Sequence, residues 1–382
     1  MTLKVALVGA GGYAASYVTR LFEPKIAELL SLTAVIDPMA TASLQYDRFK
    51  HLPIYNRLED FFAAGNKADL VIISSPIQLH YQHAMAAMAG GAHVLCEKPL
   101  VPTLAQLDSL AETAKSTDKV LAVGFQLSYA SAVLNIKERY IAGEFGKAIS
   151  LKAIVSWCKE WEYYARNNWA GKLEVNGLVV NDAVASNATA HYIHNMLFVL
   201  GDKINTAAPL TGLQAECYRA NNIETFDTIA LRGQAGGADV FYTATHAGNG
   251  DIQPRLEYTF EKVKIVIDFA NYMNPCKIYH SDGQVEEMTL DMHDGEANKI
   301  ILTAENIQGN GVPLCDVNTA RPITALLDAI FANVPFIDIP REFVTVDTGE
   351  RHTYVTGLEA DMQKCFDECK LPSEIGFDWA MG

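Results

Sequence analysis

Residues 1–14 read MTLKVALVGAGGYA, and this stretch decides the fold of the first part of the chain. The short apolar run Leu3–Val8 is bounded by glycine, which predicts a buried parallel strand. A G-x-G-x-x-A turn follows and opens a helix. In such a turn Gly9 allows the tight bend, Gly11 lets the backbone approach a pyrophosphate, and Ala14 lets the helix pack close to the strand.

The helix that opens after this turn supplies the second part of a predicted nucleotide site. Anions bind at a helix N-terminus because backbone N–H groups and the helix dipole point toward them. The strand before the turn and the helix after it favour a dinucleotide site over an ordinary glycine turn. The residues expected to contact the dinucleotide here are Gly9, Gly11, Gly12, Tyr13 and Ala14.

Asp37 follows the second predicted strand, residues 32–36, where an acidic residue recognises ribose in this fingerprint. A carboxylate there accepts hydrogen bonds from the ribose hydroxyls of NAD and repels the 2′-phosphate of NADP. No arginine or lysine stands between Asp37 and Arg48 to neutralise such a phosphate. The sequence therefore predicts NAD as the cofactor; the alternative is that Asp37 only caps a turn or a helix.

Length, charge and cysteine content narrow the class of protein. A chain of 382 residues, 49% of them apolar, suggests two domains with ample core. The formal net charge of −15 argues against nucleic acid as a partner, because phosphate binding needs a basic surface. We expect no membrane span and no signal peptide, since no apolar stretch is long enough and a strand begins at Leu3. Seven scattered cysteines without a C-x-x-C pair predict a cytoplasmic location.

The first part of the chain alternates short apolar strands with helices. After the first two strands, we predict strands at 69–74, 92–96 and 120–125 and helices at 78–88 and 103–115. This βαβ rhythm predicts an α/β fold with a doubly wound parallel sheet of the Rossmann type. We assign residues 1–125 to this dinucleotide-binding domain.

The rhythm changes after residue 126, where helices become rare. Candidate strands lie at 149–157, 212–219, 227–232, 240–245, 256–260, 263–269, 277–280 and 285–290, and helices at 133–142, 320–333 and 351–369. Consecutive strands predict an α+β domain with a large, mostly antiparallel open sheet. We assign residues 126–350 to this second domain and residues 351–382 to a closing helix and tail.

Two further segments of the first domain, together with the glycine turn, carry a resemblance to a known family. They are ADLVIISSPIQLH at 68–80 and GAHVLCEKPL at 91–100, the latter with a specific E-K-P motif. The chain resembles the Gfo/Idh/MocA family of NAD(P)-dependent oxidoreductases, relatives of glucose–fructose oxidoreductase and inositol 2-dehydrogenase. The resemblance implies hydride transfer between NAD and a hydroxyl of a sugar, polyol or sugar derivative. It also implies that the second domain binds substrate and makes subunit contacts, so we expect a homodimer or homotetramer through residues 150–290, because an exposed sheet face usually needs a partner.

Lys98 of the E-K-P motif is the first candidate catalytic residue. It follows an apolar strand at the carboxyl edge of a parallel sheet, where ligands bind in doubly wound folds. A lysine there can stabilise developing alkoxide charge as hydride leaves, and Glu97 can hold it; the alternative is a surface lysine. The remaining residues expected around the cofactor are Ser75, Pro76, His80, Glu97, Lys98 and Gln126. For His80, a histidine with only local hydrogen bonds is the alternative.

The segment 176–201 holds the second candidate pair. The family commonly has D-x-x-x-H here, whereas this chain has Asn187 and His191, which would share one helix face. His191 is suited to act as general base, because its intrinsic pKa lies near neutrality. An amide cannot ionise, so Asn187 can only orient substrate or imidazole. Either His191 acts alone with Lys98, or Asn187 binds a sugar hydroxyl; Asp182 could supply the missing carboxylate.

An aromatic-rich stretch, residues 157–169, and His194 complete the substrate candidates. Flat rings suit pyranose faces and guanidinium groups suit hydroxyls, so we expect sugar contacts from Trp169 and Arg166, with Asp182 and His194 nearby. The alternative for the aromatic rings is a folded loop in the core. His191 and His194 have the spacing of a metal pair, but no third ligand is evident and we predict no metal.

Three functions remain compatible with these residues. The favoured one is an NAD-dependent dehydrogenase of a sugar or polyol. The second is a redox-neutral enzyme that oxidises a glycoside transiently and recycles its NAD. The third is a non-catalytic NAD-binding sensor, which the replacement at Asn187 would support. Release of NADH separates the first from the second.

Overall fold

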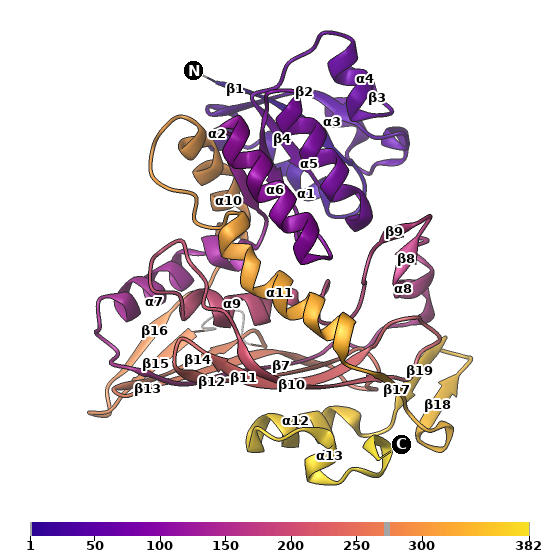
Figure 1. Ribbon diagram of the computed structural model, residues 1–382, viewed down its shortest axis with the longest axis vertical. Coiled ribbons are helices and arrows are strands. Elements are labelled where there is room, and N and C mark those ends of the chain that lie inside the picture. Colours follow the sequence, from indigo (N-terminus) through magenta and orange to yellow (C-terminus); the bar gives the residue numbers. More distant parts are fainter. Residues whose placement is uncertain (1, 271–275, 382) are drawn as a thin grey trace. The chain divides into compact units, whose positions relative to one another are not determined.

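The computed structural model describes residues 2–270 and 276–381 and divides into two compact units. The first comprises Met1–Ala130 with Met292–Thr324, and the second comprises Ser131–Asp291 with Ala325–Gly382 (Figure 1). This division differs from the consecutive stretches expected from the sequence, because residues 292–324 return to the first unit. Ile300, Ile301 and Ala304 of that segment lie in the core of the N-terminal sheet, which explains the return. The stretch 351–382 belongs to the second unit.

The first unit contains a six-stranded sheet in the order β3-β2-β1-β4-β5-β6, in which every pairing is parallel. Its strands are β1 (Leu3–Val8), β2 (Leu30–Ile36), β3 (Ile54–Tyr55), β4 (Leu70–Ile73), β5 (His93–Cys96) and β6 (Leu121–Val123). Central strands of such a sheet are covered on both faces, so they read as continuous apolar runs. The doubly wound parallel fold expected from the sequence is confirmed.

Helices of the first unit connect these strands or pack against them. They are α1 (Ala14–Leu21), α2 (Pro24–Ala27), α3 (Tyr46–Phe49), α4 (Leu58–Ala63), α5 (His80–Ala89), α6 (Leu104–Thr117) and α10 (Met292–Ile307), with 3₁₀ turns η1 (Ala40–Ala42), η2 (Ile77–Leu79) and η3 (Gln126–Tyr129). Helix α11 (Val317–Asn333) begins in the first unit and ends in the second. Thr103 caps α6 by accepting a hydrogen bond from the backbone N–H of Gln106, as a helix N-cap should.

The second unit contains a nine-stranded sheet in the order β16-β15-β14-β13-β7-β12-β11-β10-β17. Its strands are β7 (Ala148–Ser156), β10 (Thr211–Arg219), β11 (Thr228–Ala235), β12 (Ala238–Thr245), β13 (Ile252–Phe260), β14 (Val263–Asp268), β15 (Cys276–His280), β16 (Val285–Met288) and β17 (Phe336–Asp338). All pairings are antiparallel except β7 with β12 and β10 with β17. The large, mostly antiparallel sheet is therefore confirmed.

Helices lie on both faces of this sheet (Figure 1). On one side are α7 (Ser131–Ile141) and α9 (Ala190–Val199), and on the other are α12 (Leu358–Glu368) and α13 (Pro372–Ile375). The remaining elements of the unit are α8 (Trp161–Ala165), η4 (Arg341–Phe343), η5 (Asp378–Ala380) and the pairs β8 (Glu174–Val175) with β9 (Leu178–Val179) and β18 (Val344–Asp347) with β19 (His352–Val355).

Two helix predictions need correction. The helix expected at 351–369 is wrong at its start, because His352–Val355 forms β19 and the helix begins only at Leu358. Alternating β-branched and aromatic residues in HTYV favour a strand, and Gly357 with φ +80° separates it from the helix. Helix α10 was not expected, since Gly295 inside it weakens the local helix signal.

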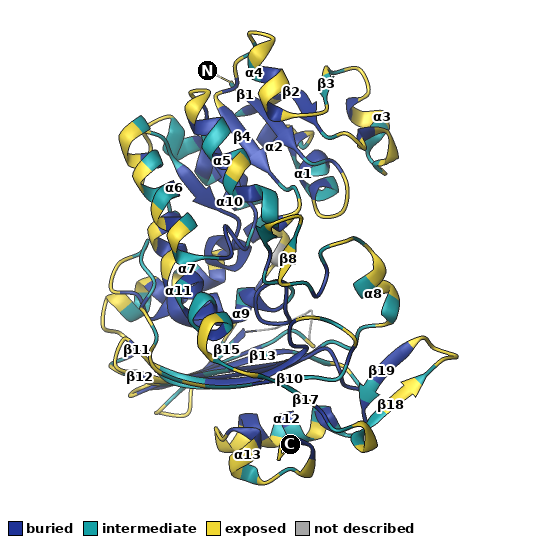
Figure 2. Cartoon of the chain, turned by 45° about the vertical axis from the view of Figure 1, so that its right-hand side comes forward, coloured by how far each residue is buried: buried dark blue, intermediate teal, exposed yellow. Residues whose placement is uncertain are grey.

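The C-terminal segment covers part of the sheet face on which we expected subunit contacts. Leu358, Met362, Phe366 and Trp379 are buried in one core cluster with residues of β7, β10, β11 and β12. Figure 2 shows buried, dark blue stretches in the C-terminal segment around α12. The premise that this face is exposed is wrong where these four strands pack against α12, α13 and η5, which supply an apolar cover there. The expected homo-oligomer through residues 150–290, which include the undescribed 271–275, therefore stays a prediction.

No helix among the described residues is both long enough and apolar enough to cross a membrane.

Candidate active site

The glycine turn of the first unit has the open backbone that a pyrophosphate requires. Gly9 has φ +92°, and a Cβ there would lie 2.6 Å from the carbonyl oxygen of Ser74, so the turn admits only glycine. A Cβ at Gly11 or Gly12 would meet nothing within 4 Å. Helix α1 begins directly afterwards at Ala14, with Tyr13 at its N-cap. The turn thus leaves room for phosphates at the positive end of a helix.

The carboxylate of Asp37 lies beside this turn. Its Oδ2 accepts a 2.7 Å hydrogen bond from the backbone N–H of Ala10, and its Oδ1 accepts a 2.7 Å bond from that of Met39. These bonds join the end of β2 to the glycine turn. Each carboxylate oxygen retains a second lone pair, so Asp37 can still accept a bond from a ribose hydroxyl. The residues of the first unit therefore fit NAD.

Three further predicted cofactor residues, Ser75, Pro76 and His80, lie between the end of β4 and the start of α5. The His80 ring has two local contacts. Its Nδ1 lies 2.9 Å from the carbonyl oxygen of Pro99, and its Nε2 lies 2.8 Å from that of Ser75. The ring is only 1% exposed, and burial lowers its pKa. These contacts favour the local role that the sequence left open, in which His80 joins the turn at Ser75 and Pro76 to the E-K-P segment.

Glu97 has a contact that the sequence did not indicate. Its carboxylate forms an ion pair with Lys299 of α10, at 2.6 Å, and the expectation that it also holds Lys98 stays a prediction. Oε1 also accepts a 2.6 Å bond from the Tyr17 hydroxyl, and Oε2 accepts a 3.2 Å bond from the backbone N–H of Lys98. Burial raises the pKa of Glu97, but the Lys299 ammonium and these donors outweigh it and hold the pKa below its usual value.

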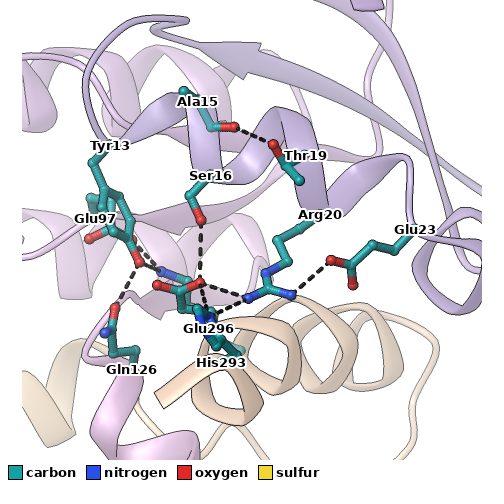
Figure 3. Close-up of polar contacts among 11 residues, drawn as sticks. Tyr13, Ala15, Ser16, Thr19, Arg20, Glu23, Glu97, Gln126, His293 and Glu296 are labelled. Atoms are coloured by element: carbon teal, nitrogen blue, oxygen red, sulfur yellow. Dashed lines mark hydrogen bonds and ion pairs between the residues drawn. The ribbon is translucent and has the colours of Figure 1, made fainter. Parts of the chain in front are cut away.

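Tyr13 and Gln126, both predicted cofactor residues, lie in the same cluster (Figure 3). The Tyr13 hydroxyl donates a 2.7 Å bond to Oε1 of Gln126 and accepts a 3.0 Å bond from Lys299. The glycine turn, the E-K-P motif and the start of η3 therefore meet at one lysine that the sequence reasoning missed. The local signal was weak, because Lys299 stands directly before the apolar run IILTA (300–304), and a lysine in that position is also typical of a solvated helix face.

In the second unit, Asn187 and Asp182 are in direct contact. The Asn187 amide donates a 2.9 Å bond to Oδ1 of Asp182, and Oδ2 accepts a 2.7 Å bond from the backbone N–H of Gly171. Asp182 is 3% exposed. The carboxylate that the sequence suggested as a replacement for the family aspartate therefore touches the asparagine at that position.

The common helix face expected for Asn187 and His191 is wrong. Helix α9 begins at Ala190, so His191 lies in its first turn, whereas Asn187 lies in the turn that precedes it. Ser186 and Thr189 hydroxyls donate to the carbonyl oxygens of Asn181 and Val184 in that turn. Such side-chain bonds compete with helical bonds and delay the start of the helix.

His194 and the aromatic stretch have contrasting environments. The His194 ring is 1% exposed and stacks on Phe198, and burial, with the Lys137 charge, lowers its pKa to about 3. This burial argues against the substrate contact expected of His194. Arg166 is exposed instead, with its guanidinium 3.7 Å from the Tyr163 ring centre and 5.2 Å from that of Trp169. Within residues 2–270 and 276–381, no three metal-ligating side chains come together.

Comparisons with known proteins agree with the NAD-binding fold of the first unit. Residues 3–125 match the GFO_IDH_MocA model, described as the oxidoreductase family with an NAD-binding Rossmann fold. The chain is 30% identical to D-glucoside 3-dehydrogenase of Escherichia coli over 38% of this chain and 41% of that protein. It is 27% identical to an inositol 2-dehydrogenase of Corynebacterium glutamicum over 48% of this chain and 51% of that protein. The chain thus spans about half or less of the curated relatives it matches.

A solved structure extends the similarity of fold to the second unit. The WlbA dehydrogenase from Bordetella pertussis, in complex with NADH and UDP-GlcNAcA, superposes with a TM-score of 0.69. The match covers 87% of this chain and 96% of that one at 20% identity, so it bears on the fold alone.

Proposed function

We propose that this chain, whose residues 3–125 are an NAD-binding Rossmann fold of the Gfo/Idh/MocA oxidoreductases, is an NAD-dependent dehydrogenase of a sugar, polyol or sugar derivative. The observation that carries the proposal is the environment of Lys98. It follows β5 at the carboxyl edge of the parallel sheet, in the same unit as the glycine turn, and its peptide N–H is held by the ionised Glu97. The similar dehydrogenases named above, one of a glucoside and one of inositol, support this substrate class.

The first unit would bind the cofactor through its backbone and one carboxylate. Gly11 and the N-terminal end of α1 would hold the pyrophosphate, and Asp37 would accept the ribose hydroxyls. Bound NAD supplies the hydride acceptor. The Lys98 ammonium would stabilise negative charge on the substrate oxygen as the hydroxyl carbon is oxidised.

The second unit would supply the proton acceptor. We assign this role to Nε2 or Nδ1 of His191, which would take the hydroxyl proton. Asp182 would orient Asn187 through their 2.9 Å bond, and the Asn187 amide would then orient a substrate hydroxyl. Arg166 and Trp169, which stack together at the surface, would contact the rest of the substrate.

The test is a panel of sugars, cyclitols and aryl glycosides offered with NAD⁺, with NADH absorbance and product analysis as readouts. A net dehydrogenase accumulates NADH in step with oxidised product. Product without NADH would point to the redox-neutral enzyme that recycles its cofactor. NAD binding without any product across the panel would contradict catalysis and favour the sensor.

We also propose a cytoplasmic homodimer or homotetramer. Because α12 and α13 already cover part of β7, β10, β11 and β12, subunit contacts would use surface outside that cover. Light scattering at micromolar concentration checks this, and a purely monomeric protein contradicts it.

A further inference from the structure

Helix α10 has one face fitted to the nucleotide-binding unit. Gly295 and Lys299 stand at i and i+4 and therefore share a helix face. A Cβ at Gly295 would lie 2.3 Å from the carbonyl oxygen of Gln126, so only glycine allows the helix to approach η3 this closely. Lys299 is 1% exposed although it carries a charge. The approach of α10 thus places a buried ammonium within the first unit.

The Lys299 ammonium is fully engaged by residues of the predicted nucleotide site. It lies 2.6 Å from Oε1 of Glu97 and 3.0 Å from the Tyr13 hydroxyl. It also lies 4.7 Å and 4.6 Å from the ring centres of Tyr13 and Tyr17, within the range of cation–π attraction. An ammonium that is buried without such partners is strongly unfavourable. The side chains of this cluster therefore stabilise the buried positive charge of Lys299.

Glu97 links the Lys299 ammonium to the E-K-P segment. Its Oε1 faces Lys299 and Tyr17, while its Oε2 accepts the backbone N–H of Lys98. A Cβ at Gly124 would lie 2.5 Å from Oε1, so glycine at that position leaves the space that the carboxylate occupies. One carboxylate therefore joins α10 to the peptide that carries Lys98.

Tyr13 links the Lys299 ammonium to the glycine turn. It is the fifth residue of the G-x-G-x-x-A motif, and its side chain is 41% exposed. Its hydroxyl accepts from Lys299 and donates to Gln126, which fixes the tyrosine ring and the glutamine amide together (Figure 3).

We propose that Lys299 is a positioning residue of the nucleotide site. Through Glu97 it fixes the peptide of Lys98, and through Tyr13 it fixes the glycine turn and Gln126. Removal of its ammonium weakens NADH binding and lowers kcat, although Lys299 itself touches neither cofactor nor substrate. The effect on kcat rests on the proposed function, whereas the effect on NADH affinity does not.

A purely structural ion pair is the competing explanation. A buried ion pair is weak evidence for stability, and a neutral pair of similar volume often replaces it without loss. The Arg20–Glu296 pair offers a matched control, because it also joins α1 to α10, at 2.9 Å, but through a carboxylate other than Glu97 (Figure 3). A variant that breaks this pair tests helix attachment alone.

The experiment compares Lys299→Met, the double variant Glu97→Gln/Lys299→Met and the control Glu296→Gln in the full-length protein. Readouts are the NADH dissociation constant from fluorescence titration, the melting temperature, and kcat and KM. We expect both Lys299 variants to bind NADH about tenfold more weakly and to lose about 10²-fold in kcat, the scale of a misplaced reacting group. Glu296→Gln lowers the melting temperature and leaves NADH affinity unchanged.

The double variant keeps the test decisive if Lys299→Met fails to fold, because it leaves no uncompensated charge in the core. Lys299→Arg, which keeps the charge but changes its geometry, should recover part of the NADH affinity. A folded double variant with wild-type NADH affinity and wild-type kcat overturns the proposal. If NADH affinity falls as expected but no substrate is oxidised even by the wild type, the proposed function fails and this inference stands.

The pH dependence of stability gives a second readout. In the wild type the pKa of Glu97 is lower in the folded than in the unfolded protein, so ionised Glu97 stabilises the fold at pH values above its unfolded-state pKa. That stabilisation is lost as the pH falls through the folded-state pKa. In Lys299→Met the stabilising ammonium is gone, so burial becomes the largest effect on Glu97 and raises its pKa above the unfolded value. The variant should therefore lose stability as the pH rises. The double variant should show neither dependence at this site. Other titratable or charged groups that act on Glu97 are Tyr13, Tyr17, His80, Cys96, Lys98 and Tyr129.

Discussion

The glycine turn of the first unit and the Asp182–Asn187 turn of the second both hold a carboxylate in place, but with different donors. Asp37 accepts bonds from the backbone N–H groups of Ala10 and Met39. Asp182 accepts bonds from the backbone N–H of Gly171 and from the side-chain amide of Asn187. A site built from main chain tolerates side-chain changes around it, whereas a site built from side chains changes with each of them. We therefore expect variants in the second unit to alter chemistry and those at Asp37 to alter cofactor choice.

The largest expected effect belongs to His191. Its replacement by alanine should lower kcat by about 10²–10⁴-fold, the usual contribution of a positioned acid–base group, and flatten the near-neutral limb of the pH–rate profile. Stopped-flow or steady-state NADH formation across pH measures both. The exposed His51→Ala is the matched control and should behave as wild type. An unchanged pH profile in His191→Ala would assign the base elsewhere, with Asp182 tested next.

Lys98→Ala should follow with a loss of about 10²–10³ in kcat, the cost of removing one group that stabilises developing negative charge. NADH affinity should be largely retained, because the charge acts mainly in the transition state. Fluorescence titration and initial rates separate the two parameters. Lys50→Ala, which removes a lysine 57% exposed, is the control. Loss of NADH binding with an unchanged kcat would show that Lys98 only binds the cofactor.

Asp37→Ala should weaken NAD⁺ binding by about 10–100-fold, the worth of hydrogen bonds to a charged group, and relax discrimination against NADP⁺. Dissociation constants for both cofactors give the ratio. Asp47→Ala, at an exposed carboxylate paired with Lys50, should leave the ratio unchanged. Equal or tighter binding of NADP⁺ by the wild type would contradict the predicted preference for NAD⁺.

Asn187 should give the smallest kinetic effect. Asn187→Ala should raise KM about three- to tenfold through the loss of one hydrogen bond, with little change in kcat. Asn187→Asp places a second carboxylate beside Asp182, which raises the pKa of one member of the pair. A folded-state pKa above the unfolded value makes stability fall as pH rises, so Asn187→Asp should melt earlier at pH 8 than at about pH 5. A melting temperature that follows the wild type at every pH would contradict the contact.

The extent of sequence-based prediction differs between the two units for a physical reason. Strands β1, β4 and β5 and the glycine turn were predicted because their apolar runs, glycines and turn signals are local. Eight of the nine strands of the large sheet were also predicted, since each has its own pattern, but the short edge strand β17 was not. The helix expected at 351–369 was wrong at its start, because a short β-branched run beside Gly357 pairs with β18 instead.

The sequence by itself determined the NAD-binding Rossmann fold and the mostly antiparallel second sheet, since glycine positions and periodicity act within short stretches. Only the tertiary structure decided that α10 returns to the first unit, that Lys299 pairs with the Glu97 carboxylate, and that Asp182 holds Asn187. Lys299 lies 202 residues from Glu97 in the chain. The reason is that a buried charge is stabilised by whichever opposite charge the packing of the whole unit brings near, and no local pattern encodes that partner.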